Sequence, residues 1–242
     1  MRIFAKTQQG KHGSNDDRIL INSTIIADGE YSCTIEKGVV AIADGVGGNN
    51  AGNIASQFVC NAIAMNPIID QDNFKRVNNQ MFELASEKPE WKSMATTCTG
   101  IYFDDSDSIT VFHVGNTRLY SVQAMSYLNQ LTQDDTTVNY LVKTGKLTEE
   151  DAENYGSRNL ITSCFGGDSE DLLSVKIFKS KKKSMYILTT DGIHESLSID
   201  DMEELISNSD DVSKIPFKLI NAAVGSHSED DCSAIVISLE ED

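Results

Sequence analysis

The chain has little of what marks several specialised protein classes. Among 242 residues there are only 3 prolines, and 40% of the residues are hydrophobic, which excludes collagen-like, low-complexity and disordered chains. The 5 cysteines are far apart and form no Cys-x-x-Cys pair, so we expect no disulfide framework and a reducing, cytoplasmic location. No apolar run approaches the roughly 20 residues that a membrane-spanning helix needs, so no membrane insertion is expected.

Basic residues are also scarce. There are 20 Lys and Arg against 37 Asp and Glu, which gives a net charge of −17. This charge repels polyanions, so nucleic acid is not an expected partner. A small anion can still be a substrate, because salt screens surface charges beyond about 8 Å and leaves the local site, with any metal in it, dominant.

Hydrophobic periodicity predicts strands, two helices, strands, two helices and a last strand. Amphipathic helices are expected over residues 51–63 and 70–86, and the polar segment 132–167 is interpreted as a flap. A meander of 99–103, 109–114 and 118–122 and a hairpin of 172–178 and 184–190 are predicted. This order favours an α+β fold with mainly antiparallel sheets and outer helices, in one domain over 1–242.

The residues of chemical interest are acidic and lie at predicted strand ends. Asp16-Asp17 and Asp230-Asp231 precede strands, whereas Asp44-Gly45 and Asp191-Gly192 follow strands. Each pair alone indicates only a turn. If the strand ends converge, the carboxylates repel one another unless a cation lies between them, and oxygen ligands select Mg²⁺ or Mn²⁺.

At these positions the sequence resembles the metal-dependent type 2C Ser/Thr protein phosphatases, particularly the small bacterial type. The resemblance covers nearly the whole chain and is carried by eight short motifs in family order. They are Asn15-Asp16-Asp17, Ala43-Asp44-Gly45-Val46-Gly47-Gly48, Thr96-Thr97, Val114-Gly115-Asn116-Thr117-Arg118, Leu131-Thr132-Gln133-Asp134-Asp135, Arg158-Asn159, Thr190-Asp191-Gly192 and Asp230-Asp231-Cys232-Ser233. The resemblance implies a central β-sandwich flanked by helices on both faces, a four-layer αββα arrangement.

The resemblance also implies roles for individual residues. Asp44 would bridge two divalent cations, Mn²⁺ or Mg²⁺, and the Gly45 carbonyl would bind one of them. Asp191 and Asp230 would be ligands of the other cation, and Asp16 and Asp17 would act mainly through water bound to the metals. Two cations about 3.5–4 Å apart can activate a water that attacks phosphorus directly.

Three positions depart from the family pattern. His12 stands where the family has a phosphate-binding Arg, and we hypothesise that it contacts the phosphate or protonates the leaving alkoxide. Asn116 replaces an Asp that serves a third metal, so that third site should be weakened. Asp16 is one methylene shorter than the usual Glu. Arg158 in the flap is a further candidate for substrate binding, with a surface ion pair as the alternative.

The expected function is hydrolysis of phosphoserine and phosphothreonine by a monomeric enzyme that opposes a Ser/Thr kinase. Two alternatives stay open. A catalytically weak relative could bind metal or phosphopeptide and act as a regulator, which the retained Asp44, Gly45, Asp191 and Asp230 disfavour. A two-metal nuclease would use similar ions, but the net charge of −17 argues against it.

Overall fold

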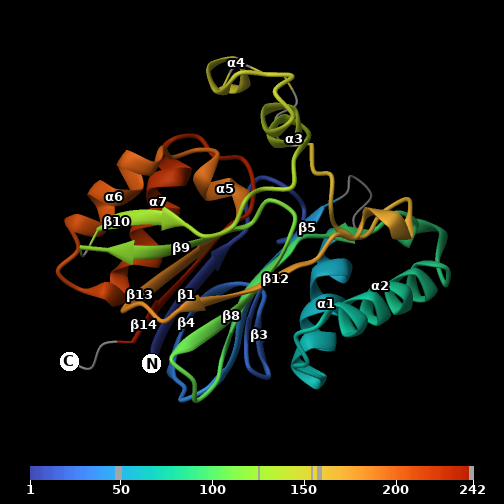
Figure 1. Ribbon diagram of the computed structural model, residues 1–242, viewed down its shortest axis with the longest axis horizontal. Helices are drawn as coiled ribbons and strands as arrows, with labels where there is room; N and C mark the ends of the chain where they lie inside the picture. Colours follow the sequence, from blue (N-terminus) through green and yellow to red (C-terminus); the bar gives the residue numbers. More distant parts are fainter. Residues whose placement is uncertain (47–50, 125, 154, 157–159, 240–242) are drawn as a thin grey trace.

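Two antiparallel sheets pack face to face, with helices on both outer faces, as the computed structural model in Figure 1 shows. The structure describes residues 1–46, 51–124, 126–153, 155–156 and 160–239. The predicted α+β fold with a four-layer αββα arrangement is confirmed.

The first sheet contains both terminal strands of the described chain, and its neighbouring strands are all antiparallel. Across the sheet the order is β10 (Tyr127–Gln130), β9 (Arg118–Gln123), β13 (Met185–Thr189), β14 (Cys232–Ser238), β1 (Arg2–Gln8) and β4 (Gly29–Thr34). The central strand β14 is buried along its whole length, because helices cover one face and the second sheet covers the other.

The second sheet is built around the long strand β5, which lies between β2 and β7. Its main order is β11 (Phe165–Gly166), β6 (Ala95–Thr96), β5 (Gly38–Val46), β7 (Cys98–Phe103), β8 (Ser108–Val114) and β12 (Lys176–Lys181), with β2 (Asp17–Ile21) and β3 (Thr24–Ile26) branching from β5. Apolar residues fill β5 from Val39 to Ala43, as expected for a strand with both faces covered.

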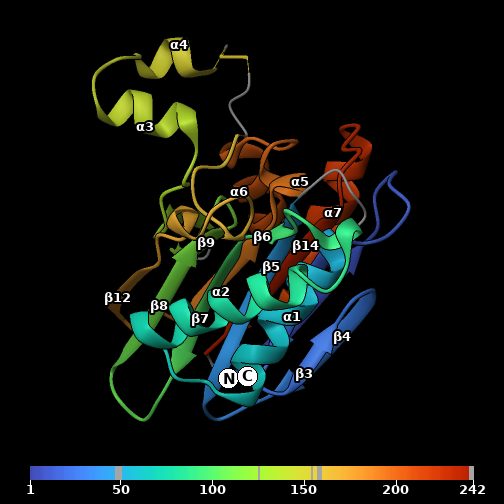
Figure 2. The same cartoon turned by 90° about the vertical axis from the view of Figure 1, so that its right-hand side faces the viewer.

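Helices α1 (Gly52–Met65) and α2 (Gln71–Ala85) cover the second sheet (Figure 2). On the other side, α5 (Asp191–His194), α6 (Ile199–Ser207) and α7 (Ile215–Gly225) cover the first sheet. Three short 3₁₀ turns complete the helical structure of the described residues: η1 (Pro89–Trp91), η2 (Glu170–Leu172) and η3 (Val212–Lys214).

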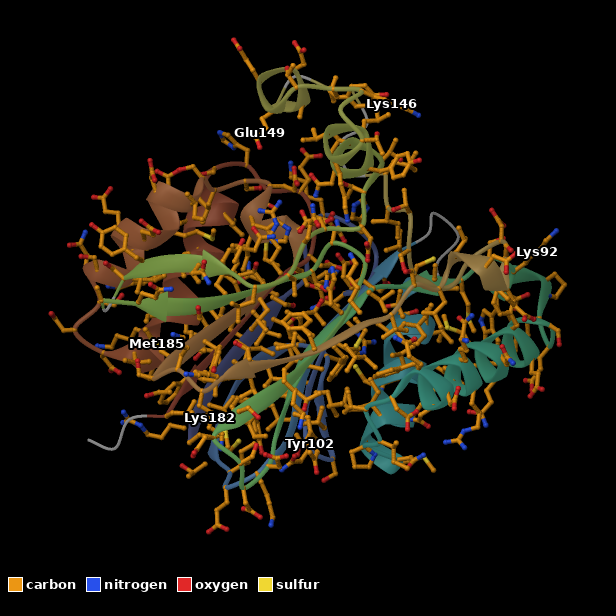
Figure 3. The ribbon with its side chains drawn as sticks, in the orientation of Figure 1. Lys92, Tyr102, Lys146, Glu149, Lys182 and Met185 are labelled. Carbon is orange, nitrogen blue, oxygen red and sulfur yellow. The ribbon has the colours of Figure 1, made fainter. Side chains whose placement is uncertain are left out.

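Helices α3 (Thr137–Lys143) and α4 (Glu149–Glu153), in the segment interpreted as a flap, stand away from the rest of the molecule in Figures 1 and 2, whereas β11 near the end of that segment lies in the second sheet. Figure 3 shows Lys146 and Glu149 on the flap, at the opposite end of the molecule from Lys182. None of the helices in the described ranges is long and apolar enough to span a bilayer.

The apolar core forms three clusters between the four layers. Their members include Phe74 and Phe112 between α2 and the second sheet, Phe103 and Tyr186 between the two sheets, and Leu219 on the buried face of α7. The central cluster joins both sheets, which fixes their strand ends relative to one another. The acidic residues at those ends therefore lie on a rigid support.

Two predicted strand connections are wrong. Segments 172–178 and 184–190 do not form a hairpin, because β12 pairs with β8 in one sheet and β13 pairs with β9 and β14 in the other. The predicted meander also fails after β8: Gly115 turns with a φ of +98°, and β9 then joins the first sheet. Local sequence favours pairing between neighbours, whereas burial between the two sheets decides the actual partners.

Candidate functional site

The site begins where β2 and β5 pair. Their antiparallel register places Asp17 directly opposite Asp44, so the first residue of β2 meets the acidic end of β5. Residues opposite one another in such a pair have Cβ atoms about 4.5–5.5 Å apart and point to the same face. The second sheet thus contributes two neighbouring carboxylates.

The first sheet contributes a second pair. Strands β13 and β14 are antiparallel, so Asp191, after β13, lies at the same edge as Asp230, before β14. Burial, followed by repulsion from Asp230, raises the pKa of Asp191, so these two carboxylates lie within electrostatic reach of each other. The predicted convergence of Asp17, Asp44, Asp191 and Asp230 is therefore present in the structure.

Burial and the crowding of carboxylates raise the pKa values of Asp44 and Asp191. Burial, followed by repulsion from Asp191, Asp17 and Asp230, raises the pKa of Asp44 well above its usual range. Burial is also the main cause that raises the pKa of Asp191 to about 6. A hydrogen bond joins Asp44 to Asp191, raising the pKa of the first and lowering that of the second. The close approach of the two carboxyls favours a proton or a cation between them.

Asp17 is held by hydroxyl groups. Its Oδ2 accepts hydrogen bonds from Thr190 Oγ1 at 2.9 Å and Ser233 Oγ at 2.6 Å. Its side chain is 1% exposed, and this burial raises its pKa despite the two donors. Thr190 directly precedes Asp191, and Ser233 lies in β14 just after Asp230. These hydrogen bonds therefore tie Asp17 of the second sheet to the first sheet at the site.

Asp16 lies beside two glycines that approach each other closely. A Cβ added at Gly45 would lie 2.2 Å from the Gly52 carbonyl oxygen, and a Cβ at Gly52 would lie 2.5 Å from Asp16 Oδ2. Neither position has room for a side chain. The motif of Asp44 explains a glycine at position 45, but no sequence pattern marks Gly52, which belongs to the first turn of α1.

Asp231 has a structural role that its motif did not reveal in the sequence. Its Oδ1 accepts from the Gly10 backbone N–H at 2.7 Å, and its Oδ2 accepts from the Asp16 N–H at 2.6 Å. Asp231 therefore fixes the loop that carries Asp16. Its place beside Asp230 was the available signal, but both residues of an Asp-Asp pair look alike in sequence.

The loop of His12 is attached to the same region. The Lys11 backbone N–H donates to the Glu229 carbonyl at 2.8 Å, and Lys11 Nζ pairs with Glu229 Oε1 at 2.6 Å. His12 itself is exposed. The loop is thus anchored next to Asp230 with the His12 side chain open to solvent, while Arg158, Gly47 and Gly48 lie outside the described residues.

Asn116 contacts the acidic cluster directly. Its Nδ2 donates to Asp191 Oδ2 at 2.9 Å, and its side chain is buried. Its Oδ1 is buried with no hydrogen-bond partner among the described residues. An amide at this position satisfies one oxygen of Asp191 and leaves a free neutral oxygen beside it.

The donor chemistry fits Mg²⁺ or Mn²⁺, because the side chains gathered here offer carboxylate and carbonyl oxygens. Although these carboxylates lie near one another, no group of three or more His, Cys, Asp and Glu side chains within the described ranges is arranged to hold a metal ion as it stands. Instead, the Asp44 carboxyl forms a hydrogen bond with Asp191, and the Asp17 carboxylate accepts hydrogen bonds from two hydroxyl groups. Binding a cation requires some of these hydrogen bonds to be exchanged for metal bonds.

Other motif residues have structural contacts. Thr97 Oγ1 accepts from the Asp44 N–H at 3.1 Å, and Thr96 Oγ1 donates to the Asp44 carbonyl at 2.9 Å, so both threonines hold the end of β5. Arg118 pairs with Asp134 at 2.7 Å, as expected for a local ion pair. His113 is fully buried and contacts Thr99 Oγ1 through Nδ1 at 2.7 Å, which fits a core histidine.

Comparison with known families finds a match to the model described as "Protein phosphatase 2C" over residues 28–216. The chain is 28% identical to the Mycobacterium tuberculosis "Serine/threonine protein phosphatase PstP" over 93% of its own length and 44% of that protein. It thus spans less than half of this relative. A "Putative protein phosphatase 2C-type" of Streptococcus pyogenes is also 28% identical, over 86% of this chain and 85% of the relative.

Solved structures give the same result. The crystal structure of "Serine/threonine phosphatase Stp1 from Staphylococcus aureus" superposes with a TM-score of 0.82 at 26% identity, covering 99% of this chain and 95% of that one. The M. tuberculosis phosphatase PstP/Ppp structure also gives a TM-score of 0.82, at 25% identity, with both chains covered completely. Both similarities extend over the acidic strand ends described above.

Proposed function

Since the chain belongs to the protein phosphatase 2C family, we propose that it is a metal-dependent Ser/Thr protein phosphatase. The observation that supports this most strongly is the meeting of Asp17, Asp44, Asp191 and Asp230 from four separate strand ends, where burial and then repulsion between carboxylates raise the pKa values of the first three. A cluster of this charge needs protons or cations to be stable. Its relatives named above are Ser/Thr phosphatases.

The family is metal-dependent, and we propose two divalent cations, Mn²⁺ or Mg²⁺, for this chain. Asp44, the Gly45 carbonyl, Asp191 and Asp230 would hold them directly, with Asp16 and Asp17 acting mainly through water. When bound, such cations lower the pKa of water and neutralise charge on the phosphoryl oxygens. Asp44 would have to release its hydrogen bond to Asp191 before it could bind a cation.

In this proposal, residues of the chain position the attacking water and the substrate phosphate. Thr190 and Ser233 hold Asp17 in place through its Oδ2, which leaves Oδ1 to orient a water. His12, exposed on the loop anchored by Lys11 and Glu229, would contact the substrate phosphate or protonate the leaving alkoxide. Arg158 is a second proposed substrate contact.

The proposed substrates are phosphoserine and phosphothreonine proteins, the products of a Ser/Thr kinase. We propose a monomer in the cytoplasm, a compartment that suits five free cysteines. The main alternative is a regulator that binds metal or phosphopeptide without efficient turnover, which the replacement of the usual arginine by His12 favours.

The test is an assay of p-nitrophenyl phosphate and a phosphothreonine peptide with and without Mn²⁺. We expect Mn²⁺-stimulated turnover that Asp44→Asn reduces by at least about 100-fold. Asp210→Asn is the control and should retain activity, because Asp210 is exposed and is not one of the proposed site residues. Metal binding without turnover of either phosphoester would favour the regulator. Cleavage of oligonucleotides would favour a nuclease.

Two substitutions test His12 in the same assay. If His12 contacts the phosphate, His12→Ala raises the KM for the peptide. If it protonates the leaving group, the variant lowers kcat for the peptide more than for p-nitrophenyl phosphate, whose leaving group needs no proton. A rate and KM unchanged by His12→Ala would remove the proposed role, and a large gain from His12→Arg would show that the natural residue weakens catalysis.

A further inference from the structure

Arg18 follows the acidic pair Asp16-Asp17 directly and has no assigned role. Its side chain turns back along the chain instead of toward solvent, and the residue is only 8% exposed. Nη1 donates to the carbonyl oxygens of Asn15 at 2.8 Å and of Asp17 at 2.7 Å. Nε donates to Gln57 Oε1 on α1 at 2.8 Å. One guanidinium thus joins the acidic segment to the helix beside it.

These bonds complete the set of contacts around the acidic segment. The carbonyl between the two that Arg18 holds, that of Asp16, accepts from Ser56 Oγ at 2.6 Å and from the Gly45 N–H at 3.1 Å. All three consecutive carbonyl groups of Asn15, Asp16 and Asp17 therefore have a donor. On the opposite side, the Asp16 N–H is held by Asp231. The backbone under both carboxylates is fixed from two directions.

The position of Arg18 is electrostatically unusual. Its guanidinium is attracted by Asp16, Asp17 and Asp231, while burial lowers its pKa below the usual value. An arginine stays protonated even so. A positive charge this close to a cation site opposes cation binding through Coulomb repulsion. An arginine at this position favours cation binding only if its hydrogen bonds strengthen the binding more than its positive charge weakens it.

We infer that Arg18 is a positioning residue: by holding the Asn15 and Asp17 carbonyls, it keeps the Asp16 and Asp17 carboxylates in the geometry that divalent cation binding needs. The inference rests on the proposed metal-dependent function. It predicts that geometry outweighs charge at this position. Lysine cannot replace it, because an ammonium is a single point donor and does not reproduce the fork that reaches two carbonyls and Gln57 at once.

Charge and geometry make opposite predictions for Arg18→Met. If the residue acted only through its charge, removing it would strengthen Mn²⁺ binding. If it acts through geometry, Mn²⁺ affinity falls, by about 10-fold as for other residues that orient metal ligands. Arg18→Lys keeps the charge and loses the fork, so we expect a similar fall. Gln57→Ala removes only the outermost bond and should change the affinity less than about 3-fold.

The experiment is isothermal titration calorimetry of Mn²⁺ into the full chain and the three variants, with folding of each checked by circular dichroism. Phosphopeptide kinetics at saturating Mn²⁺ accompany it. We expect kcat to fall in Arg18→Met while KM is retained, because the Arg18 side chain is buried and its hydrogen bonds go to the backbone and Gln57. If Arg18→Met fails to fold, the Mn²⁺ affinity of Arg18→Lys is compared with that of the unaltered chain.

Equal or tighter Mn²⁺ binding by the Arg18 variants would overturn the inference while leaving the proposed function intact. Failure of the unaltered chain to bind Mn²⁺ would instead overturn the proposed function, on which the inference depends. A fall in affinity in Arg18→Lys and Arg18→Met, but not in Gln57→Ala, supports the positioning role.

Discussion

The amide nitrogen of Asn116 donates a hydrogen bond to Oδ2 of Asp191 at 2.9 Å, so a neutral side chain lies against one of the proposed metal ligands. In the family that the sequence resembles, this position supplies a carboxylate to a third metal. The amide spares the fold one more negative charge in a region where Asp44, Asp191 and Asp230 already repel one another. It also removes one ligand charge, so a third cation should bind weakly here.

Asn116→Asp should therefore make stability depend more strongly on divalent cations. Without metal, the new carboxylate replaces a hydrogen bond by repulsion, and we expect the free energy of unfolding to fall by about 1–3 kcal/mol. With Mn²⁺, at least part of that loss should return. Thermal melts in EDTA and in Mn²⁺ measure both changes. Asn116→Ala, which loses the bond without adding charge, is the control, and an identical Mn²⁺ response in the two variants would contradict the account.

Gly52 offers a test of how tightly the backbone is packed around Asp16. An alanine Cβ there would lie 2.5 Å from Asp16 Oδ2 and 2.7 Å from the Gly45 carbonyl oxygen. We expect Gly52→Ala to lower the free energy of unfolding by about 1–3 kcal/mol and to reduce Mn²⁺ affinity, because Asp16 and Gly45 must move. Urea denaturation and calorimetry report the two effects.

Gly225 provides the matched control. It is also a helical glycine, but a Cβ added there meets no atom within 4 Å. Gly225 is the last residue of α7, so alanine is better than glycine there by at most about 0.5–1 kcal/mol, and Gly225→Ala should leave stability unchanged or raise it slightly. Stabilisation by both substitutions would show that the close approach at Gly52 is not a constraint.

His113 should make stability fall in mild acid. Burial is the main cause that lowers its pKa in the folded protein, although Asp135 opposes the shift. An unfolded histidine has a pKa of about 6.5. As pH falls below that value, the unfolded chain takes up a proton that the folded chain does not, so the free energy of unfolding decreases until the folded pKa is reached. Stability therefore rises with pH across this window.

The effect is measured by urea denaturation between pH 7 and pH 5 in EDTA. In His113→Asn this part of the pH dependence should disappear, a change in slope of up to about 1.4 kcal/mol per pH unit. His227→Asn is the control: His227 is exposed, and its φ of +69° suits asparagine. Equal slopes in the unaltered chain and His113→Asn would mean that His113 does not titrate differently on folding.

Much of the fold follows from local sequence. The apolar run Val39–Ala43 predicts β5, and the spacing of Ala55, Val59 and Ile63 predicts the buried face of α1; both are confirmed. Strand β4 was missed, because its residues 29–34 alternate between half-buried and exposed at a sheet edge and carry few apolar side chains. The pairing of β12 and β13 was wrong because partner choice depends on which sheet buries each strand, a property of the whole fold.

In the site, too, local sequence predicts some residues and the whole fold decides the others. Asp17, Asp44, Asp191 and Asp230 could be selected because short motifs mark them in sequence. Arg18 could not be selected, and Asp231, although part of a motif, could not be given its role, because both act through contacts across the fold: Asp231 reaches Gly10, 221 residues away, and Arg18 reaches α1 through Gln57. No local pattern distinguishes these side chains from an ordinary surface arginine or a turn aspartate.

Calorimetric titration of Mn²⁺ into the unaltered chain, Asp44→Asn and Asp191→Asn tests the central claim most directly. The account predicts clear binding by the unaltered chain and at least about a 10-fold loss of affinity in each variant, with release of protons on binding because the carboxyls of Asp44 and Asp191 have raised pKa values. Affinity that is the same in all three proteins would contradict it, because the cations would then bind somewhere other than among these converging acids.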